Sequence, residues 1–372
     1  MENRPIRMLV PEALKSQVTR RAALAAALGT SALGVLAACS TGSSSSSGAV
    51  EKTINLYTWG QYDDPDVLSE WGSVTLGSFD SNEELISKLT AANGTSGYDI
   101  VVPTLQYIPK MTEAGLLQEI DHSLLSNYDN LDPNYLNSEF DPDNTYSIPK
   151  AWGTCGYAYD TTVITRELTS WADFWDALQN EAAGKTSLIA DMNEIAGAYF
   201  LSQGLPITTT DESALSDYES FITSVASNIQ AFESYVSPTI AQSGRALLQG
   251  WNGDVRRGML DNEDQSRYKW VLPSDGSTLF QDNWCIPVGA PNPEGAHEFI
   301  NYVLDPDISF RELEYIGYPT GILDPDERST SEGLDDMIFF TQDQVDKMQR
   351  LAITDANDRL LEIFNALQAA AG

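Results

Sequence analysis

The sequence is poor in the residues on which several kinds of site depend. It contains three cysteines and two histidines among 372 residues. Three cysteines cannot form a disulfide-rich scaffold, nor a four-cysteine zinc site by themselves. The histidines, His122 and His297, leave little room for a histidine-rich metal site, and any Ser-His-Asp arrangement has to use one of them. The motifs G-x-x-x-x-G-K, G-x-S-x-G and H-E-x-x-H are absent as well.

Positive charge is also scarce. The chain has 21 Lys and Arg against 54 Asp and Glu, a formal net charge of −33. This balance excludes nucleic acid as a partner, because a polyphosphate would be repelled, and it disfavours docking on anionic lipid through a basic surface. The acidity has two interpretations, solvation of the surface or attraction of a cationic ligand. Screening acts within ~8–10 Å, so only carboxylates placed inside a site favour the second.

Residues 1–38 have the pattern of an export signal. A basic start is followed by an apolar run of small residues over 22–38. That run is shorter than the ~20 residues that a spanning helix needs, and it ends at Leu36-Ala37-Ala38-Cys39. The pattern resembles a bacterial lipoprotein signal, in which cleavage leaves Cys39 as a lipidated first residue. The alternative interpretation is an uncleaved anchor helix.

Two further features of this region concern the export route and the anchor. Thr19-Arg20-Arg21 resembles the twin-arginine export signal, although Ala23 stands where that signal usually has Phe or Leu. Residues 39–50 comprise Cys39 and a Ser/Gly-rich stretch, which we interpret as a flexible tether. Because one acyl chain holds a membrane only marginally, stable anchoring implies further acyl chains on Cys39.

From residue 51 onward, strand-like and helix-like patterns alternate without an internal repeat. The chain is long enough for two domains. This alternation predicts an α/β architecture with parallel sheets and with sites at the carboxyl ends of strands. The periodicity predicts strands at 53–57, 98–103, 146–159 and 187–190, and helices at 81–92, 108–117, 212–235, 294–304, 341–350 and 355–369.

Short segments at several of these strand ends occur together in a recognisable order. They are Leu56-Tyr57-Thr58-Trp59-Gly60-Gln61-Tyr62, Asp80-Ser81-Asn82-Glu83, Tyr98-Asp99-Ile100-Val101-Val102-Pro103-Thr104, Asn130-Leu131-Asp132-Pro133, Tyr146-Ser147-Ile148-Pro149, Ser170-Trp171-Ala172-Asp173, Gly250-Trp251-Asn252-Gly253-Asp254 and Ile316-Gly317-Tyr318-Pro319-Thr320. In order and spacing, over nearly all of 52–325, the chain resembles the polyamine (spermidine/putrescine)-binding proteins of ABC importers.

The resemblance implies an α/β fold of the type II periplasmic-binding-protein kind, with two lobes joined by crossing hinge strands and a ligand cleft between them. It places 51–154 plus 277–323 in lobe 1, and 155–276 plus 324–372 in lobe 2. The implied protein is a monomeric substrate-binding component without a cofactor or metal. Tethered through Cys39 to the outer face of the cytoplasmic membrane, it delivers its ligand to the permease subunits.

A polyamine sets clear chemical demands on its site. It is a string of ammonium groups on methylene chains, so each buried ammonium needs a carboxylate, other acceptors or an aromatic face, and the methylenes need flat apolar walls. The residues that match the family at such positions are Trp59, Tyr62, Thr104, Asp191, Glu194, Trp251, Asp254, Phe280 and Asp282.

In lobe 1, the resemblance gives Trp59 and Tyr62 as aromatic walls and Thr104 as a hydroxyl contact. Gly60 stands where the family usually has a hydroxyl, so that contact is absent, and Gln106 stands where spermidine-binding relatives have Tyr. For Trp59 the alternative is a residue of the lobe core.

The pair Asp191 and Glu194 has two interpretations. The resemblance makes both residues grip an amine. Their spacing of three also suits a capping box, with Asp at the N-cap of a helix and Glu in its first turn.

Further carboxylates and rings come later in the chain. The resemblance places Trp251 against the methylenes and gives Asp254 as a carboxylate found in putrescine-binding relatives, although Asp254 could instead pair with Arg256 and Arg257. Phe280 and Asp282 stand two residues apart in an extended stretch. They therefore point the same way and can touch one amine together.

Cys155 and Cys285 flank the proposed crossing strands. After export a disulfide between them is chemically allowed. The alternative is a pair of buried free thiols.

Three other classes of function compete with polyamine transport. Asp191 and Glu194 could act as the carboxylate pair of a glycosidase, although the lipid tether and the ordered segments argue against an enzyme. A binding protein of the same fold could take another cationic or amino-acid-derived molecule, as Gly60 and Gln106 suggest. A surface adhesin is the third alternative.

Overall fold

The computed structural model describes residues 52–323 and 328–371, so the predicted export signal, Cys39 and the tether lie outside the described residues. The strands are β1 (Thr53–Trp59), β2 (Ser73–Phe79), β3 (Ile100–Val101), β4 (Leu117–Gln118), β5 (Ile148–Gly153), β6 (Cys155–Asp160), β7 (Thr186–Ile189), β8 (Ile229–Glu233), β9 (Leu247–Trp251), β10 (Tyr268–Val271), β11 (Ser277–Trp284), β12 (Ile286–Pro287) and β13 (Met348–Arg350). The α-helices are α1 (Pro65–Trp71), α2 (Asn82–Ala92), α3 (Ile108–Glu113), α4 (Trp171–Gln179), α5 (Met192–Ser202), α6 (Glu212–Val225), α7 (Ser237–Ala241), α8 (Asn252–Leu260), α9 (Pro293–Val303), α10 (Pro306–Ile316), α11 (Gln342–Val345) and α12 (Asn357–Ala371).

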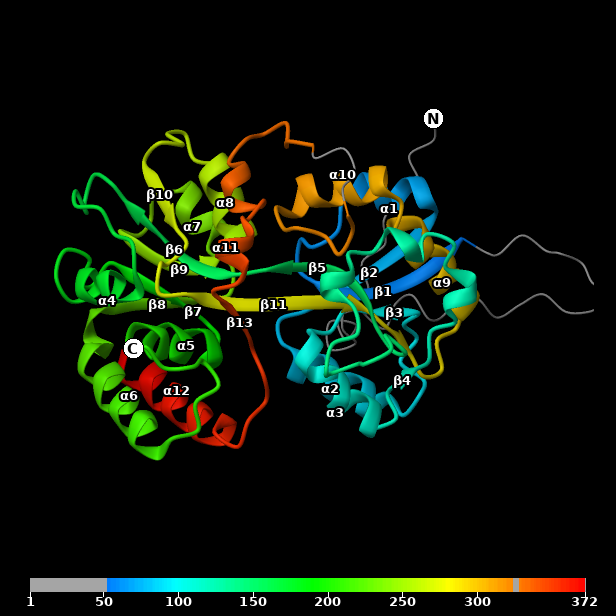
Figure 1. Cartoon of the computed structure of the whole chain (residues 1–372), viewed down its shortest axis with the longest axis horizontal. Helices are drawn as coiled ribbons and strands as arrows, with labels where there is room; N and C mark the ends of the chain where they lie inside the picture. Colours follow the sequence, from blue (N-terminus) through cyan, green and yellow to red (C-terminus); the bar gives the residue numbers. More distant parts are fainter. Residues whose placement is uncertain (1–51, 324–327, 372) are drawn as a thin grey trace, which may run out of the picture.

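The elements form two halves joined by long strands (Figure 1). The first half contains the parallel sheet β2-β1-β3 with α1–α3, α9 and α10 around it. The second half contains the mixed sheet β10-β6-β9-β7-β8 with α4–α8 and α12. Between them β11 pairs antiparallel with β5 and parallel with β13. The residue boundaries of the two lobes given above stay predictions.

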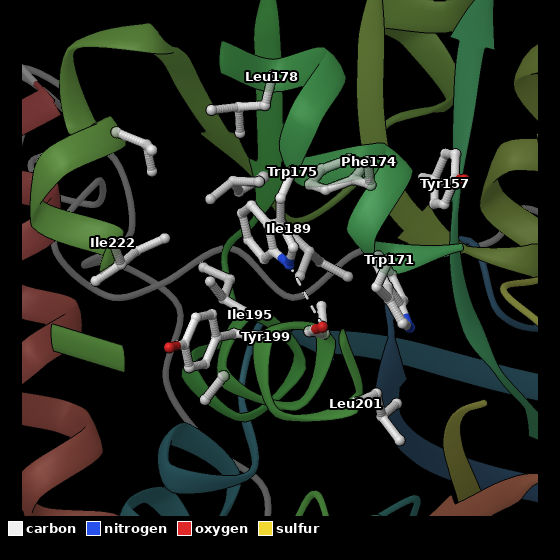
Figure 2. Packing of buried hydrophobic residues seen from close by; sticks show 14 of the residues in the cluster. Tyr157, Trp171, Phe174, Trp175, Leu178, Ile189, Ile195, Tyr199, Leu201 and Ile222 are labelled. Atoms are coloured by element: carbon white, nitrogen blue, oxygen red, sulfur yellow. Dashed lines mark hydrogen bonds between the residues drawn. The ribbon is translucent and has the colours of Figure 1, made fainter. Parts of the chain in front are cut away.

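Each half has its own apolar core, and α4 shows how the sequence builds one. Ser170 and Asp173 form a capping box that starts this helix, and Trp171, Phe174, Trp175 and Leu178 then recur at helical spacing on one buried face. Figure 2 shows Trp175 pointing toward Ile195 and Tyr199 of α5, where its indole N–H donates to the Ala198 carbonyl at 3.4 Å.

Parallel strands bring the predicted site residues to the facing edges of the two sheets. In the first half, β1 ends at Trp59 and β3 is followed by Thr104. In the second half, β7 is followed by Asp191 and β9 ends at Trp251. Ligands of α/β sheets bind beyond such carboxyl ends.

Three helix predictions are wrong in part. The segment 108–117 is helical only to Glu113, and Leu117 begins β4, which pairs with β12. The other two segments also end in strands. The segment 212–235 is helical only to Val225, and its end forms β8, which pairs with β7. The segment 341–350 forms the short helix α11 and then β13, which pairs with β11. In both segments, pairing with a distant strand overrides the local helical pattern.

The described part of the chain lacks two features that would point to other functions. No helix there combines the length and the apolar character that crossing a membrane requires. The same residues contain no group of three or more His, Cys, Asp and Glu side chains that could hold a metal ion.

Candidate ligand-binding site

Four aromatic rings form a line along β11 where the two halves meet. Trp251 lies edge-on to Phe280 with ring centroids 6.3 Å apart, and Phe280 lies edge-on to Tyr318 at 5.5 Å. Tyr318 in turn meets Tyr62 at 5.8 Å. We call Trp251, Phe280, Tyr318 and Tyr62 the aromatic line. It brings three of the predicted residues together from distant parts of the sequence, and it offers the flat apolar faces that a methylene chain needs.

Phe280 reaches the line because of a glycine on the neighbouring strand. Phe280 on β11 pairs with Gly153 on β5. A Cβ atom at Gly153 would lie 2.6 Å from the Phe280 ring. Because Gly153 has no side chain, the Phe280 ring can lie against it. Any larger residue at position 153 would displace the ring.

Asp282 lies at the Tyr62 end of the line and is 5% exposed. The Thr104 hydroxyl donates to its Oδ1 at 2.7 Å, while Thr104 accepts from the Asn82 side-chain amide at 3.0 Å. Burial raises the pKa of Asp282 to about 6, and Thr104, Tyr62 and Lys150 counteract only part of that rise. Among the described residues no cation forms a salt bridge with Asp282, so Lys150 acts on this desolvated carboxylate only from a longer distance.

Asp191 and Glu194 lie at the Trp251 end and do not form the predicted capping box. Asp191 is the N-cap of α5, and its carboxylate accepts from the backbone N–H groups of Asn193 at 2.8 Å and Glu194 at 3.1 Å. The Glu194 side chain instead accepts from the Trp251 indole at 3.3 Å and from the Thr278 hydroxyl at 2.7 Å. Glu194 therefore points toward the junction of the two halves, away from the helix end.

Burial also controls the charge of this acidic pair. It raises the pKa of Glu194 to about 7, and the neighbouring charge of Asp191 adds to the rise. Burial likewise raises the pKa of Asp191, with a contribution from Glu83 in the first half. The structure therefore holds two carboxyl groups close together whose ionised forms burial disfavours, and no described cation pairs with either of them.

Asp254 does not pair with the neighbouring arginines. Arg256 donates to the Gly333 carbonyl, and Arg257 lies 3.3 Å from Glu332. The Asp254 carboxylate accepts from the backbone N–H groups of Val236 and Ser237. The predicted alternative of an arginine pair is therefore wrong, and Asp254 fixes a segment of its own half.

Trp59 is not part of the aromatic line. Its ring lies against Phe79 with centroids 4.5 Å apart and contacts both core clusters of the first half. Its indole nitrogen is buried without a hydrogen-bond partner among the described atoms. Both interpretations of Trp59, core residue and ligand wall, stay open.

Several residues of this region are not among those predicted from the sequence. Tyr318 stands in the segment Ile316-Gly317-Tyr318-Pro319-Thr320, one of the segments that carry the family resemblance, so the sequence did contain a pattern that marks it. The Tyr107 hydroxyl donates to Glu83 at 2.8 Å, and burial raises its pKa, with smaller contributions from the charges of Glu83 and Asp191. Neither its spacing nor its neighbours mark Tyr107 in the sequence.

A buried lysine lies behind the site and was also missed. The Lys150 ammonium lies 2.8 Å from Asp63 Oδ1 and 4.0 Å from Glu312, and both partners are buried with it. It also lies 4.7 Å from the centroid of the Tyr62 ring and 4.1 Å from that of Trp284. Burial raises the pKa of Glu312 to about 8. We call Lys150, Asp63, Glu312, Tyr62 and Trp284 the lysine cage.

The possible disulfide between Cys155 and Cys285 is not formed. Both residues are buried free cysteines. Cys155 packs in the core of the second half and Cys285 in a core cluster of the first. The two thiols are therefore separated because each belongs to a different half.

Comparison with known proteins places this geometry in a family. The model of the bacterial extracellular solute-binding proteins matches residues 72–332. The chain is 32% identical over 299 residues to the spermidine/putrescine-binding periplasmic protein 1 of Haemophilus influenzae. The aligned region covers 78% of this chain and 81% of that protein. It is 33% identical over 276 residues to the spermidine/putrescine-binding periplasmic protein of Escherichia coli, over 72% of this chain and 77% of that protein.

A solved structure confirms the predicted fold. The spermidine/putrescine ABC transporter substrate-binding protein of Streptococcus pneumoniae superimposes with a TM-score of 0.74 at 26% identity, over 86% of this chain and 99% of that one. The α/β fold of the type II periplasmic-binding-protein kind is thus shown. From its two halves, its aromatic line and these matches, the chain belongs to the family of bacterial extracellular solute-binding proteins.

Proposed function

We propose that this chain is the substrate-binding component of an ABC importer and captures a polyamine, spermidine or putrescine. The observation that carries the proposal is the pair of buried acidic groups, Asp282 in the first half and Glu194 in the second, at opposite ends of the aromatic line. Relatives named for spermidine and putrescine at 32% and 33% identity support it.

The chemistry of the two ends suits a polycation. An ammonium beside Asp282 or Glu194 gains a charge-assisted hydrogen bond and restores the ionised form that burial disfavours. The rings of Phe280 and Trp251 give the methylenes an apolar wall, and a cation over such a ring gains ~0.5–2 kcal/mol. A neutral ligand would leave both carboxyls without a partner charge.

Binding of the ligand between the two halves also links its capture to its transport. A ligand that contacts both Asp282 and Glu194 stabilises the arrangement in which the halves are together, by its differential contacts. We infer that this arrangement is what the permease subunits recognise, that the chain acts as an exported monomer tethered through a lipid on Cys39, and that it carries out no catalysis.

Thermal unfolding in the presence of candidate ligands tests the proposal. Spermidine, spermine, putrescine and agmatine are compared with maltose, phosphate and neutral amino acids. A ligand at 100 times its Kd should stabilise the protein by about 2.7 kcal/mol and raise Tm, whereas the others should leave Tm unchanged. Folded protein whose Tm responds to no polyamine would instead favour the alternative, a binding protein of the same fold for another cationic or amino-acid-derived molecule.

A further inference from the structure

Tyr235 makes a direct contact between the two halves. It follows β8 in the second half, and its hydroxyl accepts the backbone N–H of Gly60, which follows β1 in the first half, at 3.3 Å. The side chain is 37% exposed, so solvent reaches it. The contact joins residues 175 positions apart in the chain, and it lies next to Trp59 and Tyr62 in the first-half loop.

Gly60 provides the space that this contact needs. A Cβ atom at Gly60 would lie 3.1 Å from the Tyr235 hydroxyl oxygen and 3.4 Å from its ring carbon Cζ. Gly60 is not among the glycines with positive φ. The backbone therefore tolerates other residues at this position, and the approach of Tyr235 is what favours glycine.

Asp254 holds Tyr235 in place from the second half. Its carboxylate accepts from the N–H groups of Val236 and Ser237, the two residues that directly follow Tyr235. The Asp254 N–H donates to the Tyr318 hydroxyl at 3.2 Å, and Tyr318 belongs to the aromatic line. Burial raises the pKa of Tyr235, and the charges of Asp80 and Asp254 add to the rise. Asp254 therefore links the segment that follows Tyr235 to Tyr318 and so to the aromatic line.

We propose that Tyr235 is a ligand-retaining residue that Asp254 positions against Gly60, so that it closes the site beside the loop that follows β1 when the two halves are together. This inference rests on the proposed function, because it assumes that a ligand is held between the halves. It gives Asp254 the role of a positioning residue, which acts on the ligand through Tyr235.

The dissociation rate of spermidine, measured by stopped flow, tests the hydroxyl. Tyr235→Phe removes one oxygen and keeps the ring. We expect the rate constant for dissociation to rise roughly fivefold, the equivalent of one net hydrogen bond, with an unchanged association rate. Tyr302→Phe is the matched control, because Tyr302 is a half-buried tyrosine on α9 within the first half. Equal dissociation rates for Tyr235→Phe and wild type would overturn the proposal.

A double-mutant cycle tests the contact with Gly60. Gly60→Ala should speed dissociation in the wild-type background, because its Cβ meets the Tyr235 hydroxyl. In the Tyr235→Ala background, the same substitution should change nothing, because the atoms that it meets are gone. Equal effects of Gly60→Ala in both backgrounds would show that Tyr235 is not what favours the glycine.

A measurement without ligand separates this inference from the proposed function. Nitroxide labels on cysteines introduced at the exposed positions Ser87 on α2 and Glu263 after α8, in a Cys39→Ser chain, report the distance between the halves. Tyr235→Phe and Gly60→Ala should increase the population at long distance relative to wild type and Tyr302→Phe. If wild type binds no polyamine but this shift occurs, the proposed function fails and the contact stands. Identical distance distributions would overturn the contact even if polyamines bind.

Discussion

Two buried carboxylates lie beside the same tyrosine, and only one of them has a cation. Asp63 and Asp282 are both buried close to Tyr62. Asp63 holds the Lys150 ammonium at 2.8 Å within the lysine cage. Asp282 accepts from the Thr104 hydroxyl and is influenced by the Lys150 charge from farther away, and no salt bridge joins it to any described cation. The cage shows what a buried ammonium requires in this protein, a carboxylate and aromatic faces, and the aromatic line offers the same groups without the ammonium.

The largest effect is expected from removing the cation that pairs with Asp63 in the lysine cage. Lys150→Met removes the cation and leaves Asp63 and Glu312 buried without a partner charge. We expect a loss of about 3–5 kcal/mol in the free energy of unfolding, measured by urea denaturation. Lys269→Met is the control, because its pair with Glu167 is exposed and should cost less than ~1 kcal/mol. A loss below that value at Lys150 would mean that the cage does not stabilise the fold.

A substitution at Asp282, the carboxylate without a salt bridge, should instead change the affinity for the ligand. Asp282→Asn keeps the shape of the side chain and removes the charge that would meet an ammonium. We expect spermidine affinity to fall more than tenfold, at least ~1.4 kcal/mol, without a loss of stability, because the amide avoids the cost of burying an ionised carboxylate. Isothermal titration and urea denaturation measure the two quantities, and Asp217→Asn on the exposed face of α6 is the control. Unchanged affinity would place the ligand away from Asp282.

A substitution at Glu194, at the Trp251 end of the aromatic line, separates a role in ligand binding from a role at the helix end. Because Asp191 alone caps α5, Glu194→Gln should cause no loss of stability and should lower spermidine affinity by roughly tenfold. The same two measurements apply. Lower stability with unchanged affinity would mean that Glu194 serves the helix end and not a ligand.

The smallest expected effect is a dependence on pH. Burial raises the pKa of Asp282 from 3.8 to about 6 and that of Glu194 from 4.5 to about 7. Because the folded state binds these protons more tightly than the unfolded chain, their contribution to stability is present at low pH and lost as pH rises through about 6 to 7. A cationic ligand needs the ionised groups, so its affinity should change in the opposite direction.

Titrations at several pH values check this expectation. Spermidine should bind several-fold more weakly at pH 5.5 than at pH 8. Asp282→Asn should flatten both trends, the rise in affinity with pH and the loss of ligand-free stability, relative to wild type. If wild type and Asp282→Asn showed the same pH profiles, Asp282 would not titrate in this range.

Much of the fold and part of the site could be predicted from local patterns. The helix α2 was predicted from Leu85, Ile86 and Leu89, and β1 from the alternation that starts at Thr53. Phe280 and Asp282 were paired correctly on one face of a strand, since both reach the aromatic line or its end. The strands β8 and β13 could not be predicted, because their hydrogen bonds go to strands distant in the sequence.

The partners of the acidic residues could not be predicted in the same way. The spacing of Asp191 and Glu194 suggested a capping box, but Thr278, 84 positions away, takes up the Glu194 side chain. The neighbours of Asp254 suggested an arginine pair, but Val236 and Ser237 donate to it. Lys150 has no partner close in sequence, since Asp63 is 87 positions away.

The sequence by itself determined the chemical character of this protein: an excess of carboxylates, aromatic residues at strand ends, and the alternation that builds an α/β fold. The tertiary structure decided which carboxylate has a cation, which caps a helix and which is left desolvated. The physical reason is that residue type and periodicity are local properties. Desolvation and hydrogen-bond partners depend on atoms that only folding brings together.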